Sequence, residues 1–177
     1  STSEDIFIGN VVAPGADGFV RLGSNSAVTS LLGVALGFAG PDKAGLATDD
    51  PYLDSSDLST LAAGLPTGER YILVADDPNQ EYFVQEDTGG TALAIADLFT
   101  AIDLLNRTVV GNVTSGFANA EIDASSVVTT TAAILQILRL HDNVNSDGTR
   151  NAVGDYAKWV VRILHHTRIT ANAAPVI

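Results

Sequence analysis

Three histidines are the residues of this chain best suited to bind a metal or to act as a base near neutral pH. His165 and His166 end a stretch, residues 156–166, in which the residue types alternate as in a strand. Neighbouring residues of a strand point to opposite faces, so these two side chains cannot both reach one ion. His141 stands apart, and the chain has no cysteine. We therefore predict no metal site and no thiol chemistry.

Oxygen-bearing side chains at alternate positions form a second pattern. Asn143, Asn145 and Asp147 precede Gly148, as at the start of a calcium loop. The position that would hold the bidentate glutamate is Gly154. Because Asn, Asp and Gly also favour the left-handed conformations of a long turn, a turn is the preferred interpretation and a calcium loop the alternative.

Adjacent carboxylates could serve as acid and base in hydrolysis. The pairs are Asp49-Asp50, Asp76-Asp77 and Glu86-Asp87, all in turn-like contexts in which solvated carboxylates are usual. No Gly-x-Ser-x-Gly elbow, no histidine beside a serine and an aspartate, and no Gly-rich phosphate loop is present. We predict no catalytic residue, no cofactor site and no enzymatic activity.

Composition limits the partners. The 177 residues carry 9 basic and 21 acidic side chains, a net charge of −12. Phosphate backbones and anionic membranes are bound through Lys and Arg, so neither nucleic acid nor a membrane is an expected partner. Charged residues make up only 17% of the chain and apolar residues 46%. Such a composition favours a surface that sister subunits cover.

The elements that must position these residues centre on two apolar runs, 127–140 and 156–166, with a turn-rich connector at 141–155. In the second run Trp159, Val161 and Ile163 share one side, the predicted core face. Lys158, Val160 and Arg162 share the other side with residues 156, 164 and 166, and its basic groups are expected to face solvent. We predict that the two runs are long antiparallel strands.

The remaining elements are shorter. We predict a hairpin of 6–12 with 19–22, and strands at 70–75 and 81–85 joined by a turn at 76–80. For residues 27–39 a strand or extended segment is the preferred interpretation and a helix the alternative, because Gly33 and Gly37 weaken the helical spacing of the apolar residues. Residues 40–56 are expected to be a long loop, either an arm or a plain surface loop. Helices are predicted at 57–64 and 91–105, and residues 117–123 should lead into the long strands.

Together these elements predict a mainly β fold, an antiparallel or barrel-like sheet in a single domain with one or two short helices and an extended N-terminal region. The expected divisions are 1–68 (N-terminal strands and arm), 69–170 (β core domain) and 171–177 (C-terminal tail). The apolar stretch 27–40 is too short and too rich in glycine for a transmembrane helix, and no signal peptide is expected.

Several segments together resemble small capsid-associated proteins of tailed bacteriophages, of the decoration or cement type. They are residues 74–87 (VADDPNQEYFVQED), 111–120, 122–126 leading into 129–130, 134–140 and 157–166, in that order. The resemblance covers about half of the chain and not its N-terminal third. The helical pattern at 91–105 departs from it.

The resemblance implies a structural role on the outer surface of the major capsid shell, where such proteins stabilise the expanded, DNA-filled head. The implied partners are the major capsid protein and further copies of the chain, a trimer being favoured over a dimer. The implied location is the virion surface, after assembly in the host cytoplasm. The main alternative is a tail or head-fibre protein whose loops at 40–56 and 142–155 bind a host. A secreted glycan-binding module is a weaker alternative, because the chain has a single tryptophan.

Overall fold

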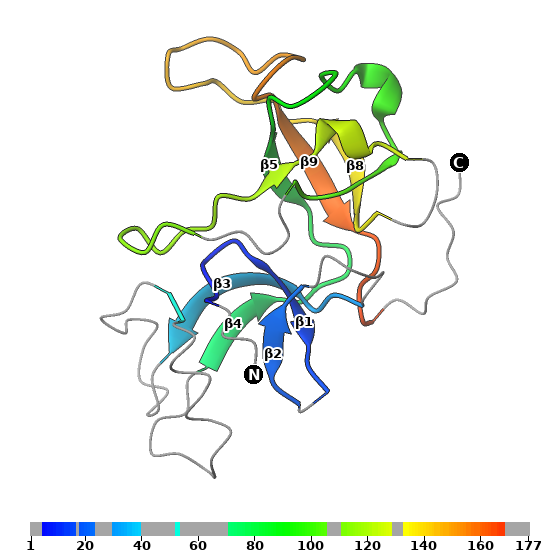
Figure 1. Cartoon of the computed structure of the whole chain (residues 1–177). Helices are drawn as coiled ribbons and strands as arrows, with labels where there is room; N and C mark the ends of the chain where they lie inside the picture. The colour runs from blue at the N-terminus through cyan, green and yellow to red at the C-terminus, as the bar shows by residue number, and fades with distance from the viewer. Residues whose placement is uncertain are drawn as a thin grey trace. The chain divides into compact units, whose positions relative to one another are not determined.

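The computed structural model describes residues 5–16, 18–23, 30–39, 52–53, 71–105, 111–128 and 133–168. Strands dominate these ranges, and the predicted mainly β, antiparallel and barrel-like class is confirmed. The helical elements described are two single 3-10 turns, η2 (Ile95–Asp97) and η3 (Ala124–Ser126). No helix in the described part of the chain is long and apolar enough to cross a membrane. The chain divides into two compact units, each with its own sheet (Figure 1).

The first unit comprises residues 1–25, 31–76 and 107–119. Its sheet has the order β2-β1-β3-β4, with β1 (Val11–Pro14), β2 (Val20–Leu22), β3 (Gly33–Ala39) and β4 (Tyr71–Ala75), all antiparallel. The predicted N-terminal hairpin forms, because Val12 lies opposite Leu22. Its first strand begins later than predicted, since Ile6 and Ile8 make only isolated bridges, to Leu53 and Phe117.

One apolar cluster forms the core of this unit: Ile6, Val12, Leu22, Ala35, Phe38 and Leu53. The choice of a strand for 27–39 is confirmed at β3, where Gly33, without a side chain, leaves room for the backbone of Ala75 at the end of β4. Most of the predicted loop 40–56 and the whole predicted helix 57–64 lie outside the described residues.

The predicted turn at 76–80 connects two different sheets. The Asn79 N–H donates to Asp77 Oδ1 at 2.8 Å, and the Gln80 N–H donates to the Asp77 carbonyl at 3.0 Å. Both flanking strands form, as β4 and as β5 (Tyr82–Glu86). However, β4 pairs with β3 of the first unit, whereas β5 pairs with strands of the second. The predicted division at residues 68 and 170 stays a prediction. The two compact units each consist of several chain segments that surround one sheet.

The second unit, residues 26–30, 77–106 and 120–177, is built on a five-stranded sheet of order β6-β8-β9-β5-β7. The new strands are β6 (Ala101–Ile102), β7 (Glu121–Ile122), β8 (Leu135–Leu140) and β9 (Lys158–Ile163). An antiparallel bridge between Leu104 and Ile122 joins the two ends of this order. The Leu105 N–H donates to the Glu121 carbonyl and the Asp123 N–H to the Asp103 carbonyl, each at 2.9 Å. The sheet is thus nearly closed into a small barrel.

The predicted core face of residues 156–166 is confirmed, since Trp159, Val161 and Ile163 are buried and Arg162 is exposed. Val160 was expected on the solvent side and is nevertheless buried. It lies opposite Phe83 on one side and Arg139 on the other, so longer neighbours flank its short side chain. His166, also expected outside, is buried because strand β9 ends at Ile163 and the alternation stops there.

Of the long strand predicted at 127–140, β8 covers the last six residues and Val128 makes an isolated bridge to Ala101, while residues 129–132 lie outside the described part of the chain. The helix predicted at 91–105 is wrong. The segment contains the single turn η2, a reversal at Phe99 with φ of 68°, and then strand β6. Ala101 and Ile102 pair with β8 and are buried there. The apolar spacing of the segment therefore serves the barrel, and tertiary packing overrides helix propensity.

Candidate functional site

The carboxylates Glu86 and Asp87 lie inside the second unit, so their interpretation as solvated turn residues is wrong. Glu86 is 0% and Asp87 5% exposed. Glu86 ends β5 with its side chain on the inward side, where Oε2 accepts a hydrogen bond from Trp159 Nε1 at 2.8 Å. Its Oε1 accepts from the Leu93 N–H at 2.6 Å. Asp87 accepts from the N–H groups of Gly89 and Ala124, each at 3.0 Å.

Burial raises the pKa of Glu86 above its ordinary value of 4.5, and the negative charges of Asp87 and Asp155 raise it further. The hydrogen bonds from Trp159 and Leu93 act in the opposite direction on this pKa, because they favour the ionised carboxylate. Each contact described joins a carboxylate to a neighbouring segment of the same unit. Glu86 and Asp87 thus connect β5 by hydrogen bonds to β9, to η3 and to the segment before η2.

The other predicted site residues do not assemble into a reactive group. Asp77 caps its own turn, and Asp49-Asp50 lies outside the described residues. His166 Nδ1 accepts from the Arg168 N–H at 3.1 Å, while His141 meets the Phe83 ring edge-on at a centroid distance of 5.2 Å. Among the described residues no three His, Asp or Glu side chains gather as a metal site would require.

The connector between β8 and β9 is held by its own side chains. Asp147 Oδ1 accepts from the N–H and hydroxyl of Thr149, at 2.9 and 2.7 Å, which lowers the pKa of Asp147 below its usual value. Asn151 donates to the carbonyls of His141 and Lys158 and accepts from the Lys158 N–H, and so fastens the loop to both strand ends. One carboxylate oxygen of Asp147, Oδ1, is thus engaged within the turn.

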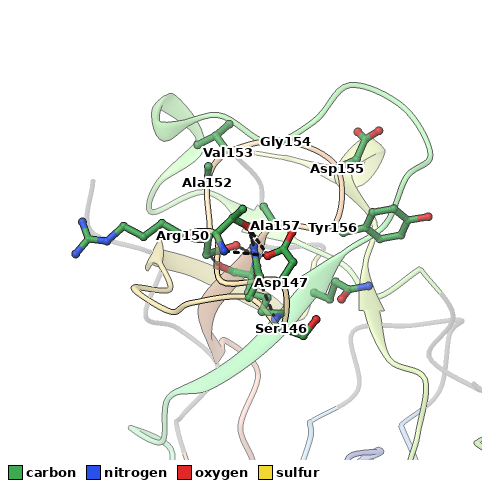
Figure 2. A pocket seen from close by; sticks show the side chains of 14 residues that line it. Ser146, Asp147, Arg150, Ala152, Val153, Gly154, Asp155, Tyr156 and Ala157 are labelled. Carbon is green, nitrogen blue, oxygen red and sulfur yellow. Dashed lines mark hydrogen bonds between the residues drawn. The ribbon is translucent and has the colours of Figure 1, made fainter.

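This connector surrounds an open depression of about 490 Å³ (Figure 2). Asp147 lies among its lining residues, while Arg150 and Tyr156 project away from one another at its two sides. Gln85 and Lys158 contribute the part that belongs to the sheet. The lining is polar and bears both signs of charge, which suits a polar ligand or a protein contact more than an apolar molecule.

The outward side of strands β5, β9 and β8 forms what we call the basic face, made of Phe83, Arg139, Lys158 and Arg162 around the buried Val160. Phe83, Val160 and Arg139 lie opposite one another in a row across the three strands. Phe83 is 71% exposed. Three of the nine Lys and Arg residues of the chain belong to this face.

Large apolar side chains are also exposed in the first unit. Leu73 of β4 lies opposite Gly37 on the side of the sheet away from the core, and Leu36 occupies the bulge beside it. They are 46% and 50% exposed. Contiguous exposed apolar side chains, unlike singly scattered ones, are typical of surfaces that contact another protein.

Sequence reasoning identified Lys158 and Arg162 as outward-facing but missed Phe83 and the buried Glu86. In the run YFVQE apolar residues occupy both parities, so alternation alone does not tell which side is buried. The pairing of Phe83 with Val160 and of Val84 with Trp159 decides it. Comparisons of the chain with protein-family models, curated proteins and solved structures find no match.

Proposed function

We propose that this protein is a non-enzymatic virion component that binds the outer surface of a major capsid shell and stabilises the expanded, DNA-filled head. The observation that carries this proposal is the exposure of large apolar side chains on the sheets of both units. Phe83 is 71%, Leu36 50% and Leu73 46% exposed. Side chains of this kind, presented by rigid strands, favour binding to another protein surface.

The charge of the protein suits the outside of a shell. With a net charge of −12 it is repelled by packaged DNA, so contact with the nucleic acid is disfavoured. The segments that resemble phage decoration proteins include those that form β5, η3, β8 and β9. The resembling segments thus supply four elements of the second unit, while residues 111–119 belong to the first.

The buried carboxylates support a structural role over a catalytic one. Both oxygens of Glu86 are engaged by N–H donors, and the side chain is 0% exposed. A general acid or base must reach a substrate proton within hydrogen-bonding distance, and Glu86 has no such access.

Shell binding would rest on many modest contacts repeated over a lattice. Avidity makes a weak single interface sufficient when the copies are linked, so we propose that the protein acts as a homo-oligomer, with a trimer favoured over a dimer. Its partners are then the major capsid protein and its own copies, and its location is the virion surface.

The test is co-sedimentation of the purified protein with expanded and unexpanded shells, together with the thermal stability of heads that contain or lack it. We expect the protein to pellet with expanded shells and to raise the temperature at which heads release DNA. The double variant Leu36→Asp/Leu73→Asp should bind less than Val144→Asp/Val153→Asp, a matched double control in the β8–β9 connector. Heads that are equally stable with and without the protein would contradict the stabilising role.

A tail or head-fibre protein that binds the host is the second candidate. The open depression of about 490 Å³ in the β8–β9 connector favours it, because loops with polar hollows commonly carry recognition. Labelling the protein on intact virions separates the two proposals: label over the whole head supports the capsid role, and label confined to the tail supports host binding.

A further inference from the structure

The surface of the barrel in the second unit differs in charge between two opposite sides. The basic face is centred on β9, and the ring order places β9 two strands from the closing seam in either direction, through β8 and β6 or through β5 and β7. We call the surface at the closing seam the acidic seam. Its residues are Asp103, Leu105, Glu121 and Asp123. Asp103 lies opposite Asp123, and Leu105 lies opposite Glu121.

The side chains of the basic face are held in place. Arg139 Nη2 lies 2.8 Å from Glu81 Oε2, and Arg162 Nε donates to Gln136 Oε1 at 2.9 Å. Lys158 Nζ donates to Asn145 Oδ1 at 3.4 Å. Since neighbouring groups already restrict them, these cations lose less conformational freedom on binding a partner than unrestrained ones would. Phe83 stands among them as an exposed aromatic anchor.

The acidic seam offers complementary chemistry. Glu121 Oε1 accepts from Gln85 Nε2 at 3.1 Å, and Asp123 Oδ1 accepts from the Ser125 N–H at 2.9 Å, so both carboxylates are anchored on the surface. Leu105, on the segment that continues from β6 and opposite Glu121, is 42% exposed. The seam therefore combines carboxylates with an apolar side chain, as the basic face combines cations with Phe83.

We propose that the basic face of one copy binds the acidic seam of a second copy. The cations of the basic face would meet the carboxylates of the acidic seam, and Phe83 would meet the apolar side chain of Leu105. Two basic faces could not make such a contact, because their like charges repel. The two surfaces differ, so the contact is head-to-tail and generates a ring where the rotation closes. This inference specifies the self-association within the proposed function, but its test requires no shell.

The test uses sedimentation velocity of the full chain over a concentration series at low and high salt. We expect the wild type to self-associate, and to do so less as salt screens the charges. The basic-face variant Phe83→Ser/Arg162→Glu and the acidic-seam variant Leu105→Ser/Glu121→Lys should each associate at least about tenfold more weakly, as loss of hot-spot contacts requires. Phe19→Ser/Arg21→Glu, in the first unit, matches the first variant residue for residue and should behave as wild type.

Mixing the two interface variants is the decisive measurement, with intact circular dichroism and Trp159 emission as the check of folding. Each variant retains the surface that the other lacks, so an equimolar mixture should form a two-chain complex and nothing larger. A mixture that stays monomeric, or a basic-face variant that associates like the wild type, would overturn the proposal. A monomeric wild type at all concentrations would overturn it as well.

Shell binding by the same proteins is measured separately. A wild type that pellets with expanded shells yet never self-associates would overturn this inference and leave the capsid role intact. A protein that self-associates as described but binds neither kind of shell would contradict the capsid role and leave this inference intact.

Discussion

Glu86 is the residue whose environment differs most from that expected of a carboxylate next to a turn. It is buried with its oxygens 2.6 Å from the Leu93 nitrogen and 2.8 Å from Trp159 Nε1. Burying a charge is costly unless donors replace the lost water, and here one indole and one backbone N–H do so. The bond to Trp159 spans 73 residues of sequence and joins β5 to β9 from inside the barrel.

Replacing Trp159 by Phe keeps an aromatic ring but removes the donor to Glu86. A buried carboxylate oxygen then lacks its partner, and the free energy of unfolding should fall by at least about 2 kcal/mol, from the lost hydrogen bond and the reduced packing. Urea denaturation followed by circular dichroism measures this loss.

A double-mutant cycle separates the hydrogen bond from the packing. In a Glu86→Leu background no buried carboxylate remains, so Trp159→Phe should cost less there than in the wild type, by about 1–3 kcal/mol. Equal costs in both backgrounds would mean that the hydrogen bond contributes nothing.

The raised pKa of Glu86 predicts a specific pH dependence of stability. The folded protein takes up a proton at a higher pH than the unfolded chain, whose carboxyl titrates near 4.5. The contribution of Glu86 to stability is therefore greatest below about pH 4.5 and declines as pH rises through the folded pKa. The free energy of unfolding of wild type minus that of Glu86→Gln should decrease across this window and then stay constant.

Urea denaturation of both proteins between acidic and neutral pH measures this difference. The pKa of Asp147 is lowered, so its contribution is lost as pH falls, but it is present in both proteins and cancels. Parallel pH profiles for the two proteins would contradict a raised pKa at Glu86.

At the scale of elements, the sequence predicts strands better than their partners. Alternation in residues 156–166 correctly placed Trp159, Val161 and Ile163 in the core, because β9 is central and buried on that side. The turn chemistry of Asp77 and Asn79 was also correct. The pairing of β4 with β3, and of β5 with β9, depends on long-range register that no local pattern encodes.

The segment 91–105 shows why some elements of the fold could not be predicted from the sequence. Its apolar residues recur at helical spacing, yet Leu93 is fixed by its N–H to Glu86 and Phe99 by its N–H to the Ile137 carbonyl at 2.8 Å. Glu86 lies seven residues before Leu93, beyond the reach of a helical hydrogen bond, and Ile137 lies on the distant strand β8. Glu86 itself gave no local signal, because a carboxylate at a strand end is usually solvated.

Gly33 is the element-scale position where one methyl group should matter most. A Cβ there would collide with the carbonyl oxygen and carbon of Ala75, at the point where β3 enters its pairing with β4. Gly33→Ala should therefore destabilise the first unit by more than about 3 kcal/mol, as backbone clashes at buried sites do. Thermal denaturation followed by circular dichroism measures it.

Gly18 is the matched control in the same unit. Its φ of 83° disfavours alanine, but a Cβ there meets nothing within 4 Å. Gly18→Ala should cost only about 1–2 kcal/mol, the penalty of a left-handed conformation. Similar losses for the two variants would mean that the strands separate to accommodate the methyl group.

At the scale of the whole molecule, the two units alternate along the chain. The first takes residues 31–76 and 107–119, and the second takes 77–106 and 120–177, so the chain passes repeatedly between them. Each unit nonetheless has its own sheet. Trp159 donates to Glu86 and lies opposite Val84 and Leu140, and all three belong to the second unit.

The single tryptophan therefore allows the units to be followed separately. Ile137→Ala, at a position that is 0% exposed, should lower the denaturation midpoint of Trp159 emission through a loss of about 2–5 kcal/mol. Amide exchange in β3 and β4 should change little. Gly33→Ala should do the opposite: it should speed exchange in β3 and β4 and move the Trp159 midpoint less, because each substitution acts on contacts within one sheet. Equal shifts of both probes in both variants would mean that the interleaved chain unfolds as one cooperative unit.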